Sequence, residues 1–401
     1  MKTALRIAIR HLGFKHQGSF TSFAGIAAVI GLGLGICALV LTVSVLNGFE
    51  DTISRKIAGL DGHIRTQHFL FRPVDPYQSK LDSILTNQSV SYSSVPYIQE
   101  AAMVRKGRRA EGILIEGYGD DELPNDIAKM VQSGSSELEN GKAVIGKALA
   151  QMLHVDVGDK LVLMDMKSMI TISSGRRMKQ VSIGGIYKSG LQEYDQSVVY
   201  LSLKDAQNLF HYENKISGYT ISLKDGNNAD IISTVLEESL GYPYYVITWK
   251  EKHNNLFNWL NLQKWPILII FGMIALVGIV NIISALFMIV LEKIRTIGTL
   301  KSMGMDNKTI RQIFLIKGVF IGSLGSLFGL ALALIFAAIQ IHYTPLSISE
   351  EIYFMRYVPV LLDWSIIGMI VFCGIFFSIL SALWPTGRAA AIDPADALRY
   401  E

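Results

Sequence analysis

The chain has 401 residues, of which 50% are hydrophobic and only 18% charged, a composition that excludes a wholly soluble protein. Lys and Arg number 37 against 34 Asp and Glu, so the net charge of +3 gives no reason to expect nucleic-acid binding. The two cysteines, Cys37 and Cys373, lie inside apolar runs, which excludes a disulfide framework and a cysteine-based zinc site as organising features.

Apolar runs without Asp, Glu, Lys or Arg extend over 19–48, 266–291, 318–341 and 364–384. A helix needs about 20 apolar residues to cross about 30 Å of hydrocarbon, so each run is long enough to span a bilayer. We therefore predict an α-helical integral membrane protein with four transmembrane helices, at 19–48, 265–291, 313–342 and 363–386. The first run is too long for the apolar part of a secretory signal and is interpreted as a retained anchor.

Lys and Arg concentrate in three segments outside these runs, and such residues stay on the cytoplasmic side during insertion. The three segments are 1–18, 292–312 and 387–401, whereas the loop 343–362 contains only Arg356. Both termini are therefore expected in the cytoplasm, and the large domain 49–264 on the outer, periplasmic face of a bacterial inner membrane. Residues 1–18 fit either an amphipathic helix on the inner surface or a basic flank that only fixes topology.

The outer segment shows two β-α-β patterns separated by an insertion that is mostly strand. The patterns cover 62–98 and 219–248, with helices near 77–85 and over 229–240. Strands of the insertion are predicted at 112–115, 160–164, 180–187 and 198–203. The sequence thus predicts a large extracytoplasmic α+β domain with a split β-α-β part and a β-rich insert.

We predict no catalytic residue and no metal site in this domain. Residues 141–148 approach a phosphate-binding loop, but Ala148 stands where such a loop needs Ser or Thr to hold magnesium. They are therefore interpreted as a turn followed by a surface helix over 146–153. The basic run 105–109 has no interleaved aromatic residues and is expected to be a solvated hairpin. The eight histidines show no metal-ligand spacing.

Glycines in the first and third spans predict close helix packing, because helices without side chains at a contact gain packing that lipid cannot replace. These glycines are Gly31 and Gly35 in the first span and Gly318, Gly322, Gly325 and Gly329 in the third. The spacing in the third span places its glycines on one helix face. The first-span glycines, together with Gly33, also fit a softened helix that bends. Since the four runs contain no charged residue, a proton relay has no candidate and the energy for transport must come from elsewhere.

The loop between the second and third spans predicts a docking helix. Ile294, Ile297, Leu300 and Met303 recur every three residues, so a short helix would present an apolar stripe beside solvated lysines. A helix outside the membrane with such a stripe suits a partner's groove. An interfacial helix without a partner is the alternative.

Four pieces of the sequence carry a family resemblance: residues 43–50, 158–161, 281–305 and 388–401. With them the chain resembles the permease subunits of ABC transporters related to the macrolide exporter MacB and the cell-division protein FtsX. Within that superfamily it is most similar to the lipoprotein-releasing permeases LolC and LolE. The resemblance covers nearly the whole chain, and the piece 43–50 is the one that points to the lipoprotein-releasing branch.

The resemblance implies a permease dimer, either a homodimer or a LolC/LolE-like heterodimer, bound to a dimer of a cytoplasmic ATPase. ATP and magnesium would belong to that ATPase, so this chain would be neither an enzyme nor a cofactor carrier. The predicted docking helix would be the coupling helix, with Lys293, Arg295, Ile297, Gly298, Leu300, Lys301, Met303 and Gly304 as its contact residues. The substrate would be a lipoprotein taken from the outer leaflet of the inner membrane.

LolC-like proteins present a hairpin that binds a periplasmic lipoprotein carrier, and 167–179 occupies the corresponding place. The candidate residues are Ile170, Ser173, Gly175, Arg176 and Arg177. Two other functions remain open. One is an FtsX- or MacB-like permease that exports another amphipathic substrate or activates an outer-face hydrolase, and the other is a membrane-anchored receptor or scaffold without an ATPase.

Overall fold

The computed structural model describes residues 19–88, 90–119, 123–139, 141–170, 177–349 and 355–391. The predicted N-terminal segment 1–18 and the tail from 392 onwards lie outside the described residues. The chain divides into two compact units, which we call the membrane unit and the outer domain. The membrane unit comprises 1–51, 259–347 and 357–401, and the outer domain comprises 52–258 and 348–356.

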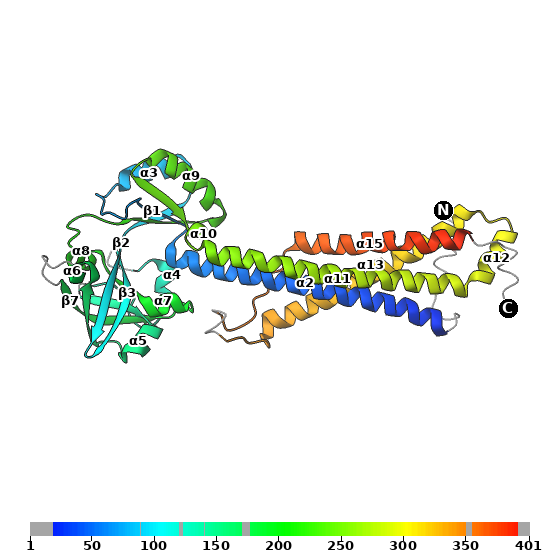
Figure 1. The fold of residues 1–401 in the computed structure, drawn as a ribbon, viewed down its shortest axis with the longest axis horizontal. Helices are drawn as coiled ribbons and strands as arrows, with labels where there is room; N and C mark the ends of the chain where they lie inside the picture. Colours follow the sequence, from blue (N-terminus) through cyan, green and yellow to red (C-terminus); the bar gives the residue numbers. More distant parts are fainter. Residues whose placement is uncertain are drawn as a thin grey trace. The chain divides into compact units, whose positions relative to one another are not determined.

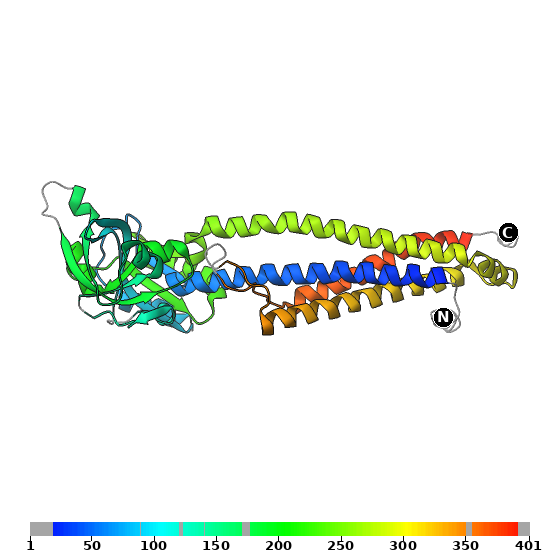
Figure 2. The same ribbon diagram turned by 90° about the horizontal axis from the view of Figure 1, so that it is seen from below.

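Among the described residues, four long helices build the membrane unit, and each is long and apolar enough to cross a bilayer. They are α2 (Ser19–Asp61), α11 (Asn254–Glu292), α13 (Asn307–Tyr343) and α15 (Trp364–Ala391). Figures 1 and 2 show these helices lying along one another, with the short helix α12 (Ile294–Ser302) between α11 and α13. Their buried faces share one hydrophobic cluster, whereas Trp265 and Phe372 are each 68% exposed and available to lipid. The prediction of four long apolar helices is confirmed.

Helices α2 and α11 extend beyond the charge-free runs that predicted them. The first run ends at Gly48, but α2 continues to Asp61, because charged residues leave the lipid without interrupting helical backbone hydrogen bonds. Helix α11 begins at Asn254, ahead of the span predicted from residue 265. The outer ends of both helices, residues 52–61 and 254–258, belong to the outer domain.

Within the described residues the outer domain has ten strands joined in one sheet. The strands are β1 (Ile64–His68), β2 (Tyr92–Lys106), β3 (Arg109–Tyr118), β4 (Val131–Gly134), β5 (Lys142–Gly146), β6 (Lys160–Asp165), β7 (Met178–Tyr187), β8 (Val198–Ser202), β9 (Gly218–Leu223) and β10 (Tyr244–Thr248). The helices are α3 (Gln78–Asn87), α4 (Asn125–Ala128), α5 (Lys147–Leu153), α6 (Met166–Ile170), α7 (Gln192–Ser197), α8 (Leu203–Phe210), α9 (Ala229–Leu240) and α10 (Trp249–Lys252), with a 3₁₀ turn at Gly226–Asn228.

One part of the sheet has the strand order β10-β1-β9-β2, and its three pairings are antiparallel. We call it the four-stranded part. Strand β9 lies between β1 and β2, and β1 lies between β9 and β10, so each β-α-β pattern is split by a strand of the other, which confirms the predicted split fold. Helices α3 and α9 cover this part (Figure 1) and bury Leu81, Leu85, Ile232 and Leu236 in a common core.

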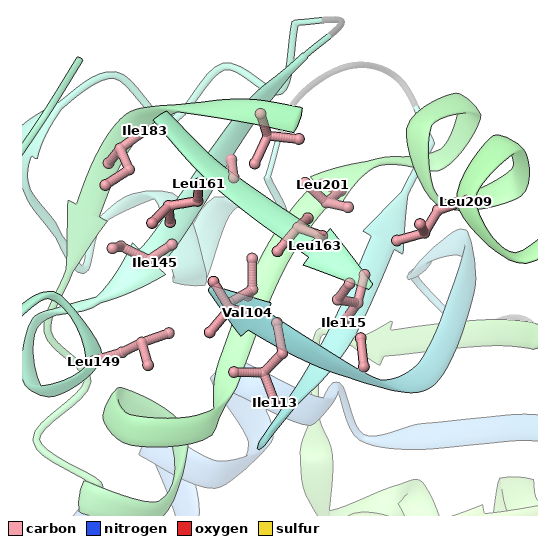
Figure 3. Packing of buried hydrophobic residues seen from close by; sticks show 14 of the residues in the cluster. Val104, Ile113, Ile115, Ile145, Leu149, Leu161, Leu163, Ile183, Leu201 and Leu209 are labelled. Atoms are coloured by element: carbon pink, nitrogen blue, oxygen red, sulfur yellow. The ribbon is translucent and has the colours of Figure 1, made fainter. Parts of the chain in front are cut away.

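The β-rich insert closes on itself as a barrel. Its pairings run from β2 to β3, β8, β5, β7 and β6, and β6 pairs with β2 again. Apolar side chains fill the interior (Figure 3), where Val104, Ile113, Ile145 and Leu163 are at most 6% exposed. Strand β2 belongs to both parts, since residues 92–97 pair with β9 and residues 102–105 pair with β6.

The segment that approaches a phosphate-binding loop has a different structure from the predicted turn. Residues Lys142–Gly146 form strand β5, and the last four of them are buried in the barrel wall. The prediction of a turn was wrong because the apolar strand is short, and the flanking glycines and Lys142 make its sequence resemble a turn. The helix predicted to follow it is present as α5, whose Leu149 and Leu153 pack into the barrel core.

Candidate functional site

Helix α12 occupies the loop where partner docking is predicted, and its faces have different surroundings. Ile297 is 3% exposed and Gly298 is buried, because this face packs on the hydrophobic cluster of the membrane unit itself. Met303, just after the helix, is 79% exposed. The predicted apolar stripe is therefore divided. Ile297 contributes to the chain's own fold, whereas Met303 is accessible to a partner.

The rest of the predicted coupling residues lie in α12 or next to it. Lys293 precedes the first turn, Arg295 is exposed and Leu300 is half-buried. The Lys301 ammonium donates a hydrogen bond of 2.8 Å to the carbonyl oxygen of Ala390, so the loop is fastened to the end of α15. Gly304 has a φ of 90°, in the left-handed region that favours glycine, and turns the chain after α12.

The four glycines of α13 contact two different helices. A methyl group on Gly318 would lie 2.5 Å from the Cβ of Ala382 on α15, and one on Gly322 would overlap Ser378 of the same helix. Ser378 also donates a hydrogen bond of 2.9 Å to the carbonyl oxygen of Gly318. The predicted single packing surface is thus two surfaces, because Gly325 and Gly329 face α2 instead.

The glycines of α2 likewise contact two different helices, α11 and α13. Methyl groups on Gly31 and Gly35 would lie 3.1 and 3.2 Å from side-chain atoms of Asn281 and Ile274, both on α11. Gly33, between them, faces Phe328 of α13, where an added methyl group would come within 2.7 Å of the ring. Gly33 therefore makes the closest approach of the three to a neighbouring helix.

An apolar cavity of about 600 Å³ lies between α2, α11 and α15. Its wall is formed mainly by aliphatic and aromatic side chains, including Leu32, Ile36, Phe271, Ile370 and Phe377. Asn47 and Lys264 line it as well, and the Lys264 ammonium lies 2.8 Å from the Glu50 carboxylate. The cavity suits a hydrocarbon chain, and Asn47 and Lys264 add polar groups to its wall.

The sequence piece 43–50, near the outer end of the first span, holds the segment that precedes α15. The backbone N–H of Leu361 donates a hydrogen bond of 2.9 Å to the carbonyl oxygen of Ser44. A methyl group on Gly48 would lie 2.6 Å from the carbonyl oxygen of Pro359, so only glycine permits this approach. The motif therefore has a packing role within the membrane unit.

The candidate carrier-binding hairpin is described only at its base. Ser173, Gly175 and Arg176 lie outside the described residues, and Ile170 ends α6. Arg177 donates a hydrogen bond of 3.3 Å to the carbonyl oxygen of Phe210 and lies 3.5 Å from the Asp165 carboxylate. Arg177 thus fastens the base of the hairpin to the barrel.

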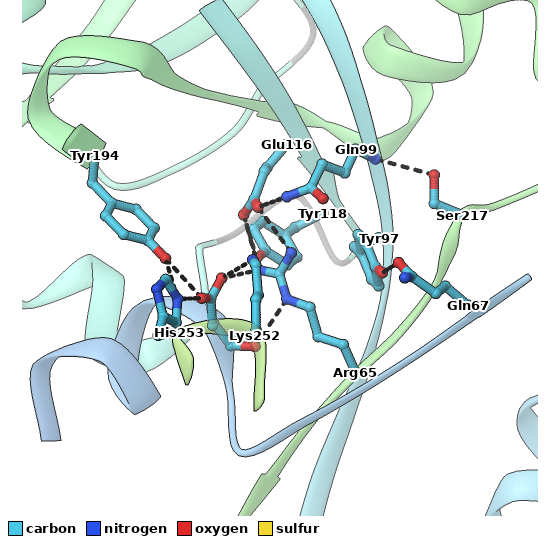
Figure 4. Close-up of polar contacts among 11 residues, drawn as sticks. Arg65, Gln67, Tyr97, Gln99, Glu116, Tyr118, Tyr194, Ser217, Lys252 and His253 are labelled. Atoms are coloured by element: carbon cyan, nitrogen blue, oxygen red, sulfur yellow. Dashed lines mark hydrogen bonds and ion pairs between the residues drawn. The ribbon is translucent and has the colours of Figure 1, made fainter. Parts of the chain in front are cut away.

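Sequence analysis did not predict a buried cluster of charged side chains in the outer domain (Figure 4). At its centre is Asp61, which is 1% exposed and closes α2. The Asp61 carboxylate lies 2.6 Å from Lys252 Nζ, 2.6 Å from His253 Nε2 and 3.0 Å from Arg65 Nη2. Tyr194 donates a further hydrogen bond of 2.7 Å to it.

Arg65 extends the cluster to the barrel. Its guanidinium donates two hydrogen bonds, of 3.0 and 3.3 Å, to the two carboxylate oxygens of Glu116 on β3. Gln99 and Tyr118 also donate to Glu116, at 2.5 and 2.8 Å. Glu116 is 1% exposed and Arg65 3% exposed, so the pair is almost fully removed from water. Such pairs need hydrogen bonds to offset desolvation, and here each of the three guanidinium nitrogens of Arg65 donates at least one.

The cluster fixes the ionisation of its members. Burial alone would raise the pKa of the Asp61 carboxyl, but Arg65 and the hydrogen bonds from His253 and Lys252 outweigh burial and hold that pKa well below its usual range. Burial and the nearby Arg65 lower the pKa of Lys252, opposed by Asp61 and Glu116. Burial and Asp61 raise the pKa of Tyr194, so its hydroxyl remains a donor. Within the described residues, no group of three or more His, Cys, Asp or Glu could hold a metal ion.

Two family comparisons together span most of the chain. The MacB-like periplasmic core domain matches residues 26–238, and the FtsX-like permease C-terminal region matches residues 268–394. This chain belongs to the FtsX/MacB-like family of ABC permeases. It is therefore a non-catalytic, multi-pass subunit of the inner membrane that carries a periplasmic domain and works with a separate ATPase.

Full-length relatives add detail to this assignment. The chain is 26% identical to LolC of Xylella fastidiosa, with 99% of each chain covered, and 26% identical to LolC of Neisseria meningitidis, with 98% of each covered. It is 24% identical to LolE of Haemophilus influenzae, with 99% of each chain covered. All three relatives are described as transmembrane proteins of a lipoprotein-releasing system.

Proposed function

We propose that this chain is a permease subunit of an ATP-driven machine that extracts lipoproteins from the outer leaflet of the inner membrane and passes them to a periplasmic carrier. The observation that carries the proposal is the similarity to LolC and LolE over 98–99% of the chain, across the outer domain as well as the membrane helices. In this proposal the chain pairs with a second permease, as a homodimer or a LolC/LolE-like heterodimer. Both termini face the cytoplasm, where a dimeric ATPase binds ATP and magnesium.

The apolar cavity between α2, α11 and α15 supports a substrate with acyl chains. Its wall offers hydrocarbon contacts throughout, and Lys264 and Asn47 offer polar contacts beside them. Each buried methylene contributes about 0.8 kcal/mol to membrane anchoring, so three acyl chains hold a lipoprotein far too firmly for spontaneous release. Work from ATP is therefore required, and membrane lipid competes for the same cavity.

Two regions are assigned to the partners of this cycle. The ATPase contacts α12 and the residues that follow it, with the exposed Met303 at the contact. The carrier contacts the hairpin at 167–179, whose base Arg177 fixes on the barrel. Deleting residues 171–176 should stop transfer to the carrier while leaving ATPase binding intact, which can be measured by cross-linking the carrier to the purified complex.

The proposal is tested by depleting the protein and fractionating mature lipoproteins between inner and outer membranes. We expect outer-membrane lipoproteins to accumulate in the inner membrane. Unchanged sorting of lipoproteins would refute the lipoprotein assignment, and only the assignment to the permease family would remain. Complementation with the intact gene serves as the control for indirect effects of depletion.

A second function is favoured by the FtsX-like match over residues 268–394. In it the permease uses ATP to move its outer domain and activates an outer-face hydrolase, or it exports another amphipathic substrate. Recovery of a bound lipoprotein with the purified complex would contradict both versions. A receptor or scaffold without an ATPase is no longer supported, because the chain belongs to an ABC permease family.

A further inference from the structure

The buried cluster around Asp61 joins elements from distant parts of the chain. Asp61 ends α2, Lys252 and His253 directly precede α11, Arg65 lies in the four-stranded part and Glu116 lies in the barrel. Helices α2 and α11 are each unbroken, and each has its outer end in the outer domain and the rest in the membrane unit.

We propose that this cluster is a clamp, which makes the outer ends of α2 and α11, the four-stranded part and the barrel move as one body. Asp61 is its central positioning residue. The proposal rests on the proposed function, because it assumes that an ATPase displaces the membrane helices. Displacement of either helix would then move the barrel and the candidate carrier-binding hairpin by the same amount. It would not be absorbed by relative motion of the parts of the outer domain.

The two oxygens of Asp61 are shared in a way that suits a clamp. Oδ1 lies 2.6 Å from Lys252 and 3.0 Å from Arg65, and Oδ2 lies 2.6 Å from His253 and 2.7 Å from Tyr194. Each oxygen therefore has one partner that precedes α11 and one partner in the body of the domain. Because the carboxylate is 1% exposed, water cannot replace a lost partner cheaply, and separating α2 from α11 is costly.

Further hydrogen bonds hold the partners themselves in place. The side chain of Thr248 accepts from the backbone N–H of Glu251, and Glu251 accepts from the backbone N–H of Thr248, so α10 begins with a complete capping box. Arg65 also donates a hydrogen bond of 3.0 Å from Nε to the backbone carbonyl oxygen of Asp61. Lys252 and Arg65 thus approach Asp61 from fixed positions.

Charge counting separates a clamp from a cluster that only stabilises the fold. Asp61 and Glu116 balance Arg65 and Lys252. Replacing Asp61 alone leaves an uncompensated buried cation, which would destabilise the domain under either interpretation. Replacing Asp61 and Lys252 together leaves Arg65 and Glu116 balanced, and it removes the ion pair between α2 and the residues that precede α11.

The deciding experiment compares wild type with the double variant Asp61→Asn/Lys252→Met, each purified with its ATPase and reconstituted with lipoprotein and carrier. The double variant should melt within about 4 °C of wild type, because neutral replacement of a buried ion pair is often tolerated. It should retain ATP hydrolysis while release per ATP falls about tenfold, a usual size for lost coupling. A stable double variant with wild-type release would overturn the clamp.

A matched control removes an exposed ion pair from the same helix. Lys250 on α10 lies 3.4 Å from Asp230 on α9, and the two side chains are 42% and 61% exposed. The double variant Lys250→Met/Asp230→Asn should therefore leave release per ATP at the wild-type value. An equal loss of release in this control would also count against the clamp, because it would show that any change at α10 has the same effect.

A second readout does not depend on lipoprotein. A fluorophore at Arg108→Cys, on the exposed β2–β3 turn of the barrel, is placed in a chain with Cys37→Ala and Cys373→Ala. We expect vanadate trapping of the ATPase to change its emission in wild type and not in Asp61→Asn/Lys252→Met. If wild type shows this change without releasing lipoprotein, the clamp stands and the substrate assignment fails. If the double variant keeps the change, or wild type lacks it, the clamp fails.

Discussion

The carbonyl oxygen of Gly33 on α2 lies so close to Gly329 on α13 that a methyl group on Gly329 would overlap it. Backbone meets backbone at this point, so no rotamer change can make room for a side chain. The helices must separate instead, and in lipid such a separation forfeits packing that nothing replaces.

Gly329→Leu should therefore destabilise the membrane unit by about 1–3 kcal/mol, the usual cost of overpacking. Gly368→Leu on α15 is the matched control, because an added methyl group there meets no atom within 4 Å. Thermal unfolding in detergent checks the prediction. Equal melting temperatures for the two variants would contradict the observed packing.

The exposed fractions of Met303 and Ile297 distinguish a docking residue from a core residue. Met303→Asp should abolish recovery of the ATPase and leave thermal stability unchanged, because Met303 is 79% exposed and an aspartate would be buried only in a complex. Ile297→Asp should lower stability itself, since Ile297 is 3% exposed.

Co-purification of the ATPase with each variant measures this difference. Tyr343→Asp, at the far end of α13 and 80% exposed, is the control and should retain the ATPase. Normal recovery of the ATPase with Met303→Asp would place the docking surface elsewhere.

Acid should reveal the contribution of Asp61 to stability. Because the folded-state pKa of Asp61 is held below its unfolded value of about 3.9, its contribution is complete above that pH and declines as the pH falls through lower values. Asp61→Asn should lose about 3–5 kcal/mol at neutral pH, since it leaves an unpaired buried cation, and should show a shallower decline in acid.

Urea unfolding of the purified protein between about pH 2.5 and 7 tests the acid dependence. Parallel stability curves for wild type and Asp61→Asn would show that Asp61 has an ordinary pKa. Asp230→Asn, which removes a largely exposed carboxylate, serves as the control and should reproduce the wild-type curve.

Gly48 provides a test of the packing role of residues 43–50. Gly48→Ala should lower stability by about 1–3 kcal/mol, because the new methyl group would lie 2.6 Å from the carbonyl oxygen of Pro359. Gly25→Ala in the same helix meets no atom within 4 Å and should be neutral or slightly stabilising. Thermal unfolding of both variants decides whether Gly48 is required for packing.

Periodicity and charge predicted much of this architecture. The helix over Ala229–Leu240 and the strand over Tyr244–Thr248 have the predicted bounds, because both are short amphipathic segments between clear turn residues. Strand β5 was missed, since five residues flanked by glycines carry too little periodic signal. Barrel closure could not be predicted either, because pairings such as β6 with β2 join residues far apart in the chain.

The buried charge cluster could not be predicted from the sequence for a similar reason. The four-residue spacing of Asp61 and Arg65 is visible in the sequence, but it looks like an ordinary surface pair on a helix. In the structure α2 ends at Asp61 and Arg65 belongs to β1, so the four-residue spacing does not place the two side chains on one helix face. The partners Glu116 and Lys252 are contributed by distant segments whose meeting only the fold determines.

Strand β2 has a consequence for building chimeras of this permease with its relatives. The backbone of β2 is hydrogen-bonded to β9 over residues 92–97 and to β6 over residues 102–105. The barrel therefore cannot be exchanged as a separate unit that two loops join to the rest of the chain. A one-residue insertion between these stretches would turn every later side chain of β2 to the opposite face. The return crossing over residues 211–217 belongs to no named strand, but Ile216 forms a β-bridge with Val74 and the backbone N–H of Ser217 donates a hydrogen bond to the carbonyl oxygen of Tyr97, so a graft should keep the length of this segment as well.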